Sequence, residues 1–152
     1  MSNNSIGDFH WMVTMFNNID VGMVVIDSEY NILSWNGFMV HHSNIDASDA
    51  KDKNLFDLFP SIDKPWLIKK IDTVKTIENQ AFITWEQKPH LFPFENYRPI
   101  TSTVEFMYQN ITIIPLPSLT GKIDKISLII YDVTDAAANR LELQSLRAQK
   151  SS

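Results

Sequence analysis

The chain has 152 residues, enough for one domain with its own core, and its apolar and charged fractions of 44% and 20% are those of a globular protein. It contains no cysteine, which excludes disulfide bonds, thiolate metal sites and cysteine nucleophiles. The net charge is −5 and the first 50 residues contain no lysine or arginine, so no nucleic-acid partner is expected, because such binding needs a clustered basic surface.

No apolar stretch approaches the roughly 20 residues that span a bilayer, and the N-terminus lacks the pattern of a secretory signal. We therefore expect a domain that does not insert into a membrane and that is located in the cytoplasm.

The first part of the chain predicts a helix, a hairpin and several helical turns. Residues 1–7 are polar and are predicted to be a disordered N-terminus. Apolar residues at helical spacing within Phe9–Ile19 predict an amphipathic helix. The β-branched runs Val21–Asp27 and Ile32–Trp35 flank a turn-forming segment and predict a hairpin. Asn36–Phe59 has short, poorly periodic pieces, which predict short helical turns.

The second part predicts one longer helix, three strands and a terminal helix. Pro65 suits a first helical turn, and Lys64–Ile77 has helical spacing of its apolar residues. Lys88–Ser102 contains three prolines and is predicted to be a long connection between strands. Ala136–Lys150 lacks glycine and proline and predicts a helix that projects from the last strand. The predicted strands are Gln80–Gln87, Thr103–Leu116 and Ile123–Val133.

Three sequence motifs, in this order along the chain, resemble those of PAS domains. The first is Val25-Ile26-Asp27, a polar turn, and then Ile32-Leu33-Ser34-Trp35-Asn36. The second is Asn54–Pro60, preceded by Lys53 where glycine is common in the family, and the third is Tyr131–Asp135. The resemblance covers about residues 10–135, nearly the whole chain.

The resemblance implies an α+β fold, with a five-stranded antiparallel sheet, helices packed on one face, and flanking N-terminal and C-terminal helices. It divides the chain into a disordered segment at 1–7, a PAS sensory domain at 8–135 and the start of a signalling helix at 136–152. It also implies a sensory and dimerisation module that has no catalytic residues of its own. A ligand-free interaction and dimerisation domain is the alternative.

Two segments, Trp85–Phe92 and Tyr97–Thr101, resemble a subgroup of PAS domains found upstream of GGDEF diguanylate cyclase domains. This chain lacks the GGD/EEF signature, so the resemblance implies an output domain elsewhere in the same polypeptide. The apolar residues Phe9, Met12, Phe16 and Ile19 of the N-terminal helix predict a parallel homodimer, formed through this helix, the outer face of the sheet, or both.

Aromatic residues concentrate in Trp85–Thr101, which is the candidate binding segment. The candidate ligand-binding residues are Trp85, His90, Tyr97, Arg98 and Tyr108. Arg98 is suited to hold a carboxylate or phosphate, with Trp85 and Tyr97 as apolar walls, and we expect a pocket between the sheet and Lys64–Ile77. In the alternative, Arg98 pairs with an acidic residue and the aromatic side chains seal a loop over the sheet.

Neither haem nor a cysteine-linked flavin is favoured as a cofactor. A haem-binding PAS domain would be expected to carry a histidine on its long helix, and Lys64–Ile77 has none. A flavin photoadduct requires a cysteine. A non-covalent small organic ligand remains compatible with the sequence. Among the four histidines no metal-ligand spacing occurs, and the adjacent His41 and His42 are expected at the surface.

The closing motif places three polar residues where the last strand meets the terminal helix. Asp132 and Thr134 are both suited to accept hydrogen bonds from the free N–H groups of a helix start. Asp135 adds a favourable negative charge in the first turn. We interpret these residues as the signal-transmission junction; the alternative is a plain helix cap without a signalling role.

Overall fold

The computed structural model describes residues 2–96 and 106–151, with side chains from Ser5 to Lys150 outside the gap. A single antiparallel sheet in the order β2-β1-β5-β4-β3 forms the centre of the fold. This confirms the expected five-stranded antiparallel sheet and α+β class. The strands are β1 (Gly22–Asp27), β2 (Ile32–Trp35), β3 (Ala81–Ile83), β4 (Gln109–Pro117) and β5 (Ile123–Asp132).

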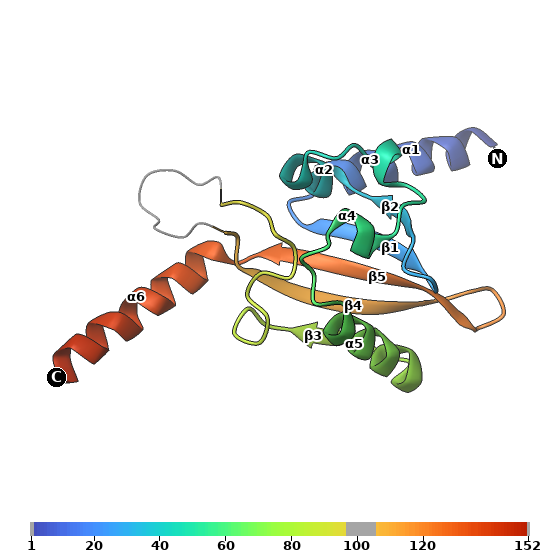
Figure 1. The fold of residues 1–152 in the computed structure, drawn as a ribbon. Helices are drawn as coiled ribbons and strands as arrows, with labels where there is room; N and C mark the ends of the chain where they lie inside the picture. Colours follow the sequence, from blue (N-terminus) through green and yellow to red (C-terminus); the bar gives the residue numbers. More distant parts are fainter. Residues whose placement is uncertain (1, 97–105, 152) are drawn as a thin grey trace.

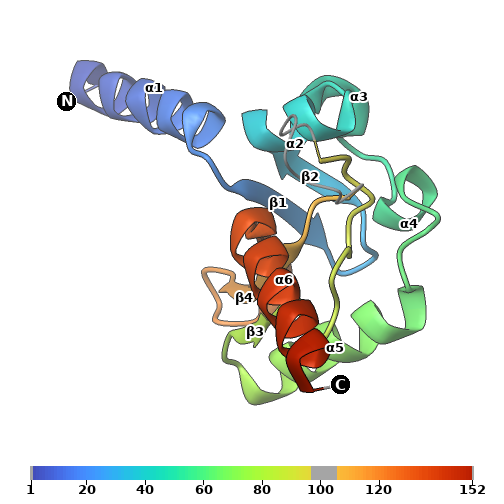
Figure 2. The same cartoon turned by 90° about the vertical axis from the view of Figure 1, so that its left-hand side faces the viewer.

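Helices cover one side of the sheet, and two further helices leave it at opposite ends. Their bounds are α1 (Ser2–Asn18), α2 (Gly37–Ser43), α3 (Ala47–Ala50), α4 (Leu55–Leu58), α5 (Lys64–Ile77) and α6 (Thr134–Ser151). Figure 2 shows α2 to α5 on one side of the sheet, where α2 contacts β1, α3 contacts β2 and α5 contacts β4. The terminal helices α1 and α6 point away from the body in opposite directions (Figure 1).

The β1–β2 hairpin forms as its sequence predicts. Alternation along β1 places Val24 and Ile26 in the core. The Asp27 carboxylate accepts hydrogen bonds from the backbone N–H groups of Glu29 and Asn31, each at 2.9 Å, and this closes the turn.

Helix α5 has the predicted bounds. Asp63 caps it, because its side chain accepts a hydrogen bond from the Trp66 N–H at 3.3 Å, and Pro65 lies in the first turn. Its inner face is fully buried at Leu67, Ile71 and Val74. The three short helices α2, α3 and α4 confirm the helical turns expected between the hairpin and α5.

The N-terminal helix joins the body through a close backbone contact. A Cβ atom on Gly37 would lie 2.0 Å from the backbone oxygen of Asn17, so only glycine fits at the start of α2. The neighbouring Asn36 is fully buried, and its side-chain amide donates to the Val21 carbonyl at 2.8 Å and accepts from the Met23 N–H at 3.0 Å. The end of α1 is therefore held against α2, beside a buried hydrogen-bond network.

Several predicted boundaries are wrong. Residues 2–7, predicted to be disordered, are helical, because a helix nucleated by later residues extends through polar ones without apolar contacts. The predicted strand Gln80–Gln87 is only Ala81–Ile83, since residues 84–88 form a turn. Strand β4 begins at Gln109, after an isolated bridge between Glu95 and Phe106. Helix α6 begins at Thr134 rather than Ala136.

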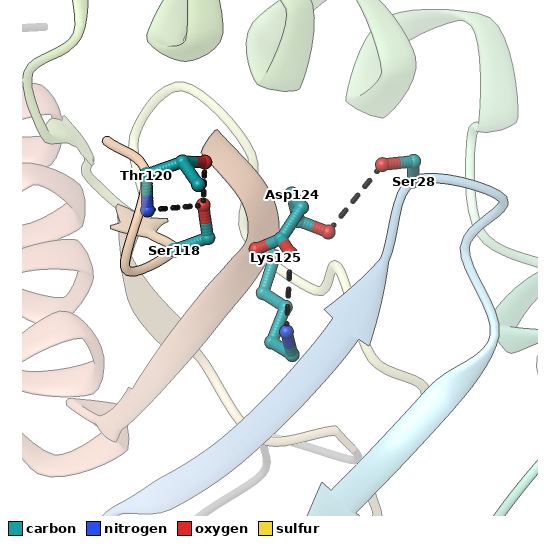
Figure 3. Close-up of polar contacts among 5 residues, drawn as sticks. All are labelled: Ser28, Ser118, Thr120, Asp124 and Lys125. Atoms are coloured by element: carbon teal, nitrogen blue, oxygen red, sulfur yellow. Dashed lines mark hydrogen bonds and ion pairs between the residues drawn. The ribbon is translucent and has the colours of Figure 1, made fainter. Parts of the chain in front are cut away.

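A cluster of polar contacts closes the β4–β5 hairpin at the end of the sheet far from α6 (Figure 3). The Ser118 and Thr120 hydroxyl oxygens lie 2.8 Å apart in the turn, and the Ser28 hydroxyl donates to the Asp124 carbonyl at 3.4 Å. The Lys125 ammonium lies 3.3 Å from the Asp124 carboxylate. Asp124 is the second residue of β5 and Asp132 is its last, so this cluster is separate from the junction with α6.

Candidate functional site

Three of the five candidate ligand-binding residues come together beside the end of β5. The ring centroid of Tyr108 lies 5.4 Å from that of Trp85 and 4.6 Å from that of His90. The His90 Nδ1 atom lies 2.9 Å from the Met107 carbonyl oxygen, so the tautomer protonated at Nδ1 donates a hydrogen bond there. Tyr97 lies outside the described residues, as does Arg98.

Two further aromatic residues of this segment belong to the core. Phe92 and Phe94 are buried, stack on each other with centroids 5.4 Å apart, and pack against Phe59. The buried Gln109 side chain holds the backbone of Phe92: its Nε2 donates to the Phe92 carbonyl at 2.9 Å, and its Oε1 accepts from the Phe92 N–H at 3.0 Å. This packing agrees with the alternative in which aromatic residues seal a loop over the sheet.

The inner face of α5 is tightly packed at three of its residues. Leu67, Ile71 and Val74 have no surface that water can reach, so side chains fill the region beside them. The predicted pocket between the sheet and α5 therefore does not reach these three side chains, and its existence stays a prediction. Two hollows of the described surface measure about 550 Å³, along the outer side of α5, and about 210 Å³, between α1 and Met23.

Sequence reasoning missed two buried polar groups. The Trp35 indole N–H is buried and has no hydrogen-bond partner among the described residues, a costly state that a bound acceptor or a water molecule would relieve. The His42 ring packs against Phe38 at 4.3 Å and Phe94 at 5.8 Å between centroids, so its Nδ1 atom is buried and the residue is half-buried, whereas His41 is exposed as expected. Neither position carries a sequence signal, because burial depends on residues distant along the chain.

The junction between β5 and α6 is a compact polar arrangement. Thr134 is only 1% exposed, and its hydroxyl donates to the Asp132 carboxylate at 2.6 Å while it accepts from the Tyr108 N–H at 3.0 Å. The Asp132 carboxylate also accepts from the Thr134 N–H at 3.0 Å, as a helix cap does. Asp135 is exposed in the first turn of α6.

Thr134 thus differs from the expectation that it caps the helix. Its oxygen accepts a hydrogen bond from a neighbouring strand segment instead, and the Val133 N–H donates to the Tyr108 carbonyl at 2.9 Å. The aromatic cluster and the start of α6 are therefore joined through the backbone of one residue, Tyr108.

Charged residues on the turn before this cluster reach α5. The Lys88 ammonium lies 3.0 Å from an Asp63 carboxylate oxygen and 4.9 Å from the centroid of the Trp66 ring. The hydrogen bond from Lys88, followed by that from the Trp66 N–H, lowers the pKa of Asp63 below its ordinary value.

The described residues form neither a metal-ligand cluster nor a helix that could cross a membrane. Within 2–96 and 106–151, no group of three or more histidine or acidic side chains is placed to hold a metal ion. Within the same ranges, no helix is long and apolar enough to cross a membrane.

Comparisons with known proteins identify the family. The family model described as the PAS fold matches residues 12–83. A sensory box sensor histidine kinase from Vibrio cholerae is 30% identical, with a TM-score of 0.61, and the match covers 88% of this chain and 99% of that one. No curated protein sequence matches this chain.

Two less similar solved structures share the fold. The PAS domain of a protein from Colwellia psychrerythraea is 12% identical, with a TM-score of 0.60 and coverage of 84% of this chain and 98% of the other. The PAS domain of BvgS from Bordetella pertussis is 16% identical, with a TM-score of 0.54 and coverage of 94% and 98%. Together with the Vibrio cholerae relative and the matched family model, the five-stranded sheet shows that this chain belongs to the PAS family of sensory domains in signalling proteins.

Proposed function

We propose that this domain senses a small molecule or a partner protein near residues 85–108 and passes the change to an output domain through α6. The observation that carries the proposal is the buried Thr134 hydroxyl, which joins Asp132 at the start of α6 to the Tyr108 N–H. Tyr108 in turn contacts Trp85 and His90 through its ring. A displacement of the aromatic cluster would therefore reach the first turn of α6 through one residue.

The ligand in this proposal is a non-covalent small organic molecule. The chain has no cysteine for a covalent flavin, and α5 has no histidine for haem. Arg98 is proposed as the partner of an anionic group on the ligand, with Tyr97 beside it. Arg98→Ala should then abolish stabilisation by the ligand while the melting temperature of the ligand-free domain stays nearly unchanged; a large loss of ligand-free stability would make Arg98 a structural ion-pair partner.

A ligand-free dimerisation module is the second candidate. Two observations favour it: Phe92 and Phe94 fill the core beneath the aromatic segment, and α1 exposes large apolar side chains. Phe9 is 69% exposed and Met15 is 58% exposed, far more than an isolated globular domain usually leaves on one helix. In both candidates the domain works as a homodimer, with α1 as the proposed contact surface.

The output domain is proposed to lie in the same polypeptide. The sequence resemblance of Trp85–Phe92 and Tyr97–Thr101 favours a diguanylate cyclase, whereas the 30% identical Vibrio cholerae relative is titled a sensor histidine kinase. Sequencing the gene beyond the codon for Ser152 and assaying the encoded domain for cyclic di-GMP synthesis or for autophosphorylation would decide between them.

The junction is tested in a polypeptide that joins this chain to its output domain. The double variant Asp132→Ala/Thr134→Ala should uncouple the output from the sensor, while the ligand affinity of the domain changes by no more than a few fold. Asp124→Ala/Thr120→Ala is the matched control, because it changes the same residue types at the opposite end of β5 and should leave regulation intact.

Normal regulation in the junction variant would contradict the proposal, since the signal would then leave through α1 or the dimer contact. Mass spectrometry and an absorption spectrum of the natively purified domain separate the two candidates. A retained organic ligand supports the sensor, and a domain that neither retains nor binds small molecules supports the ligand-free module.

A further inference from the structure

One short turn contacts both α5 and α6. On one side, the Lys88 ammonium lies 3.0 Å from the Asp63 carboxylate and above the Trp66 ring, at the N-terminal end of α5. On the other side, the Glu86 carboxylate lies 2.9 Å from the guanidinium of Arg140, in the second turn of α6. Two residues of a single turn therefore join helices that are far apart in the sequence.

The turn itself is held rigidly. The backbone N–H groups of Gln87 and Lys88 both donate to the Thr84 carbonyl, at 3.0 and 3.1 Å, and the Gln87 side chain accepts from the Thr84 N–H at 3.2 Å. The Trp85 N–H donates to the Asn110 side chain on β4 at 2.8 Å. A displacement of Lys88 would therefore move Glu86 with it rather than be absorbed within the turn.

Most of helix α6 is exposed. Ala137 is fully buried, but every residue from Asn139 to Lys150 is exposed. Arg140 follows Ala137 by three residues, so both lie on the helix face turned toward the domain. The pair with Glu86 thus holds α6 at a point beyond the Asp132–Thr134 junction.

We propose that residues 84–88 form an electrostatic strap that couples the N-terminal end of α5 to the direction of α6, by a route separate from the Asp132–Thr134 junction. The proposal relies on the proposed function only for the statement that α6 carries the signal. The proposed coupling between Lys88 and the second turn of α6 involves only residues of this chain and needs no ligand or output domain.

Hydrogen exchange of the whole chain, followed by mass spectrometry, tests the strap through the amides of residues 138–143. Glu86→Gln and Arg140→Gln should each raise their exchange about two- to fivefold, the range for an exposed ion pair. The double variant should match either single variant, because both remove the same pair. The reversed pair Glu86→Arg/Arg140→Glu should restore slow exchange.

The coupling is tested from the α5 side. Lys88→Gln should also raise the exchange of residues 138–143, and it should add nothing in an Arg140→Gln background, because the link is already broken. Lys125→Gln is the matched control: it removes the exposed pair with Asp124 at the far end of β5 and should leave α6 unchanged. Unchanged α6 exchange in Lys88→Gln, or additive effects of Lys88→Gln and Arg140→Gln, would overturn the strap.

These measurements require neither a ligand nor an output domain. Failure of the strap therefore leaves the Asp132–Thr134 junction and the proposed sensing role untouched. Conversely, an Asp132→Ala/Thr134→Ala variant that regulates normally contradicts the proposed function without changing the result expected for Lys88→Gln.

Discussion

The two terminal helices, α1 and α6, are attached to the same sheet by opposite kinds of contact. Helix α1 is fixed by packing: its last turn meets Gly37 without room for a side chain, and it exposes apolar residues such as Phe9. Helix α6 is fixed by polar groups, the Thr134 hydroxyl and the Arg140 guanidinium. A partner that buries apolar surface strengthens packing contacts, whereas a change in nearby charge or hydrogen bonding strengthens or weakens polar contacts.

This difference assigns different roles to the ends of the domain. The exposed side of α1 is suited to association with a second copy, because it exposes large apolar side chains. Asp8 is the only charged residue among residues 2–19. Helix α6 is the proposed route of transmission, because its contacts through Thr134 and Arg140 are polar.

Charges placed on α1 should have the largest effect. Phe9→Glu/Met15→Glu should weaken the proposed homodimer about a hundredfold, or about 2.7 kcal/mol, because each glutamate would be desolvated in the contact. The fold itself should be retained, since both side chains are exposed in the monomer. Sedimentation at several protein concentrations measures the change, and a wild-type chain that stays monomeric at high micromolar concentration would contradict the dimer.

A methyl group added at Gly37 should disrupt the close contact between α1 and α2. Gly37→Ala should reduce the free energy of unfolding by about 1–3 kcal/mol, because the added Cβ forces the Asn17 backbone away. Gly7→Ala, in α1, is the control, since a Cβ atom at Gly7 would meet nothing within 4 Å. Urea denaturation of both variants should show a loss only for Gly37→Ala. Equal stability of Gly37→Ala and wild type would show that α1 is not fixed there.

Removing the buried hydroxyl at the start of α6 should have a smaller effect. Thr134→Val should cost about 1–2 kcal/mol of stability, because the Tyr108 N–H loses its acceptor while the side-chain volume is conserved. Thr120→Val, in the exposed hairpin turn, should change stability by less than about 0.5 kcal/mol. Thermal unfolding of the two variants provides the comparison, and similar losses in both would contradict a special role for Thr134.

The smallest effect concerns the pH dependence of the Asp63 cap. Lys88, then the Trp66 N–H, lowers the pKa of Asp63 below its ordinary value of 3.8. The stabilisation is therefore complete above that ordinary value and is lost as the pH falls through the lowered pKa. An NMR titration of the Asp63 carboxyl carbon should show the lowered value, and Lys88→Gln should move it back toward 3.8. Titration of wild-type Asp63 at or above 3.8 would exclude the pair in solution.

Local sequence patterns predicted the elements whose stability is local. The β1–β2 hairpin and α5 formed at the predicted positions, because alternation, turn residues and a proline in the first turn each act within a few residues. The last strand and the helix after it were also located to within two residues, since Asp132 is a helix-capping residue type.

The connection after α5 could not be predicted in the same way. Gln80–Gln87 alternates like a strand, yet its pairing with β4 ends at Ile83. Two residues later, the Trp85 N–H donates a hydrogen bond to the side chain of Asn110 instead of to a strand backbone. Likewise, Phe92 lies in the candidate binding segment, and its backbone is bonded to the side chain of Gln109, which lies 17 positions further along the chain.

The sequence by itself determined the family, the order of most elements and the residues that join β5 to α6, because these depend on composition and on neighbours along the chain. Only the tertiary structure decided that the Thr134 hydroxyl bonds to the Tyr108 N–H and that Glu86 pairs with Arg140. It also decided that Gly37 packs against the backbone of Asn17 at the end of α1. Each of these contacts joins residues about twenty or more positions apart, and no local pattern specifies which distant group a side chain meets.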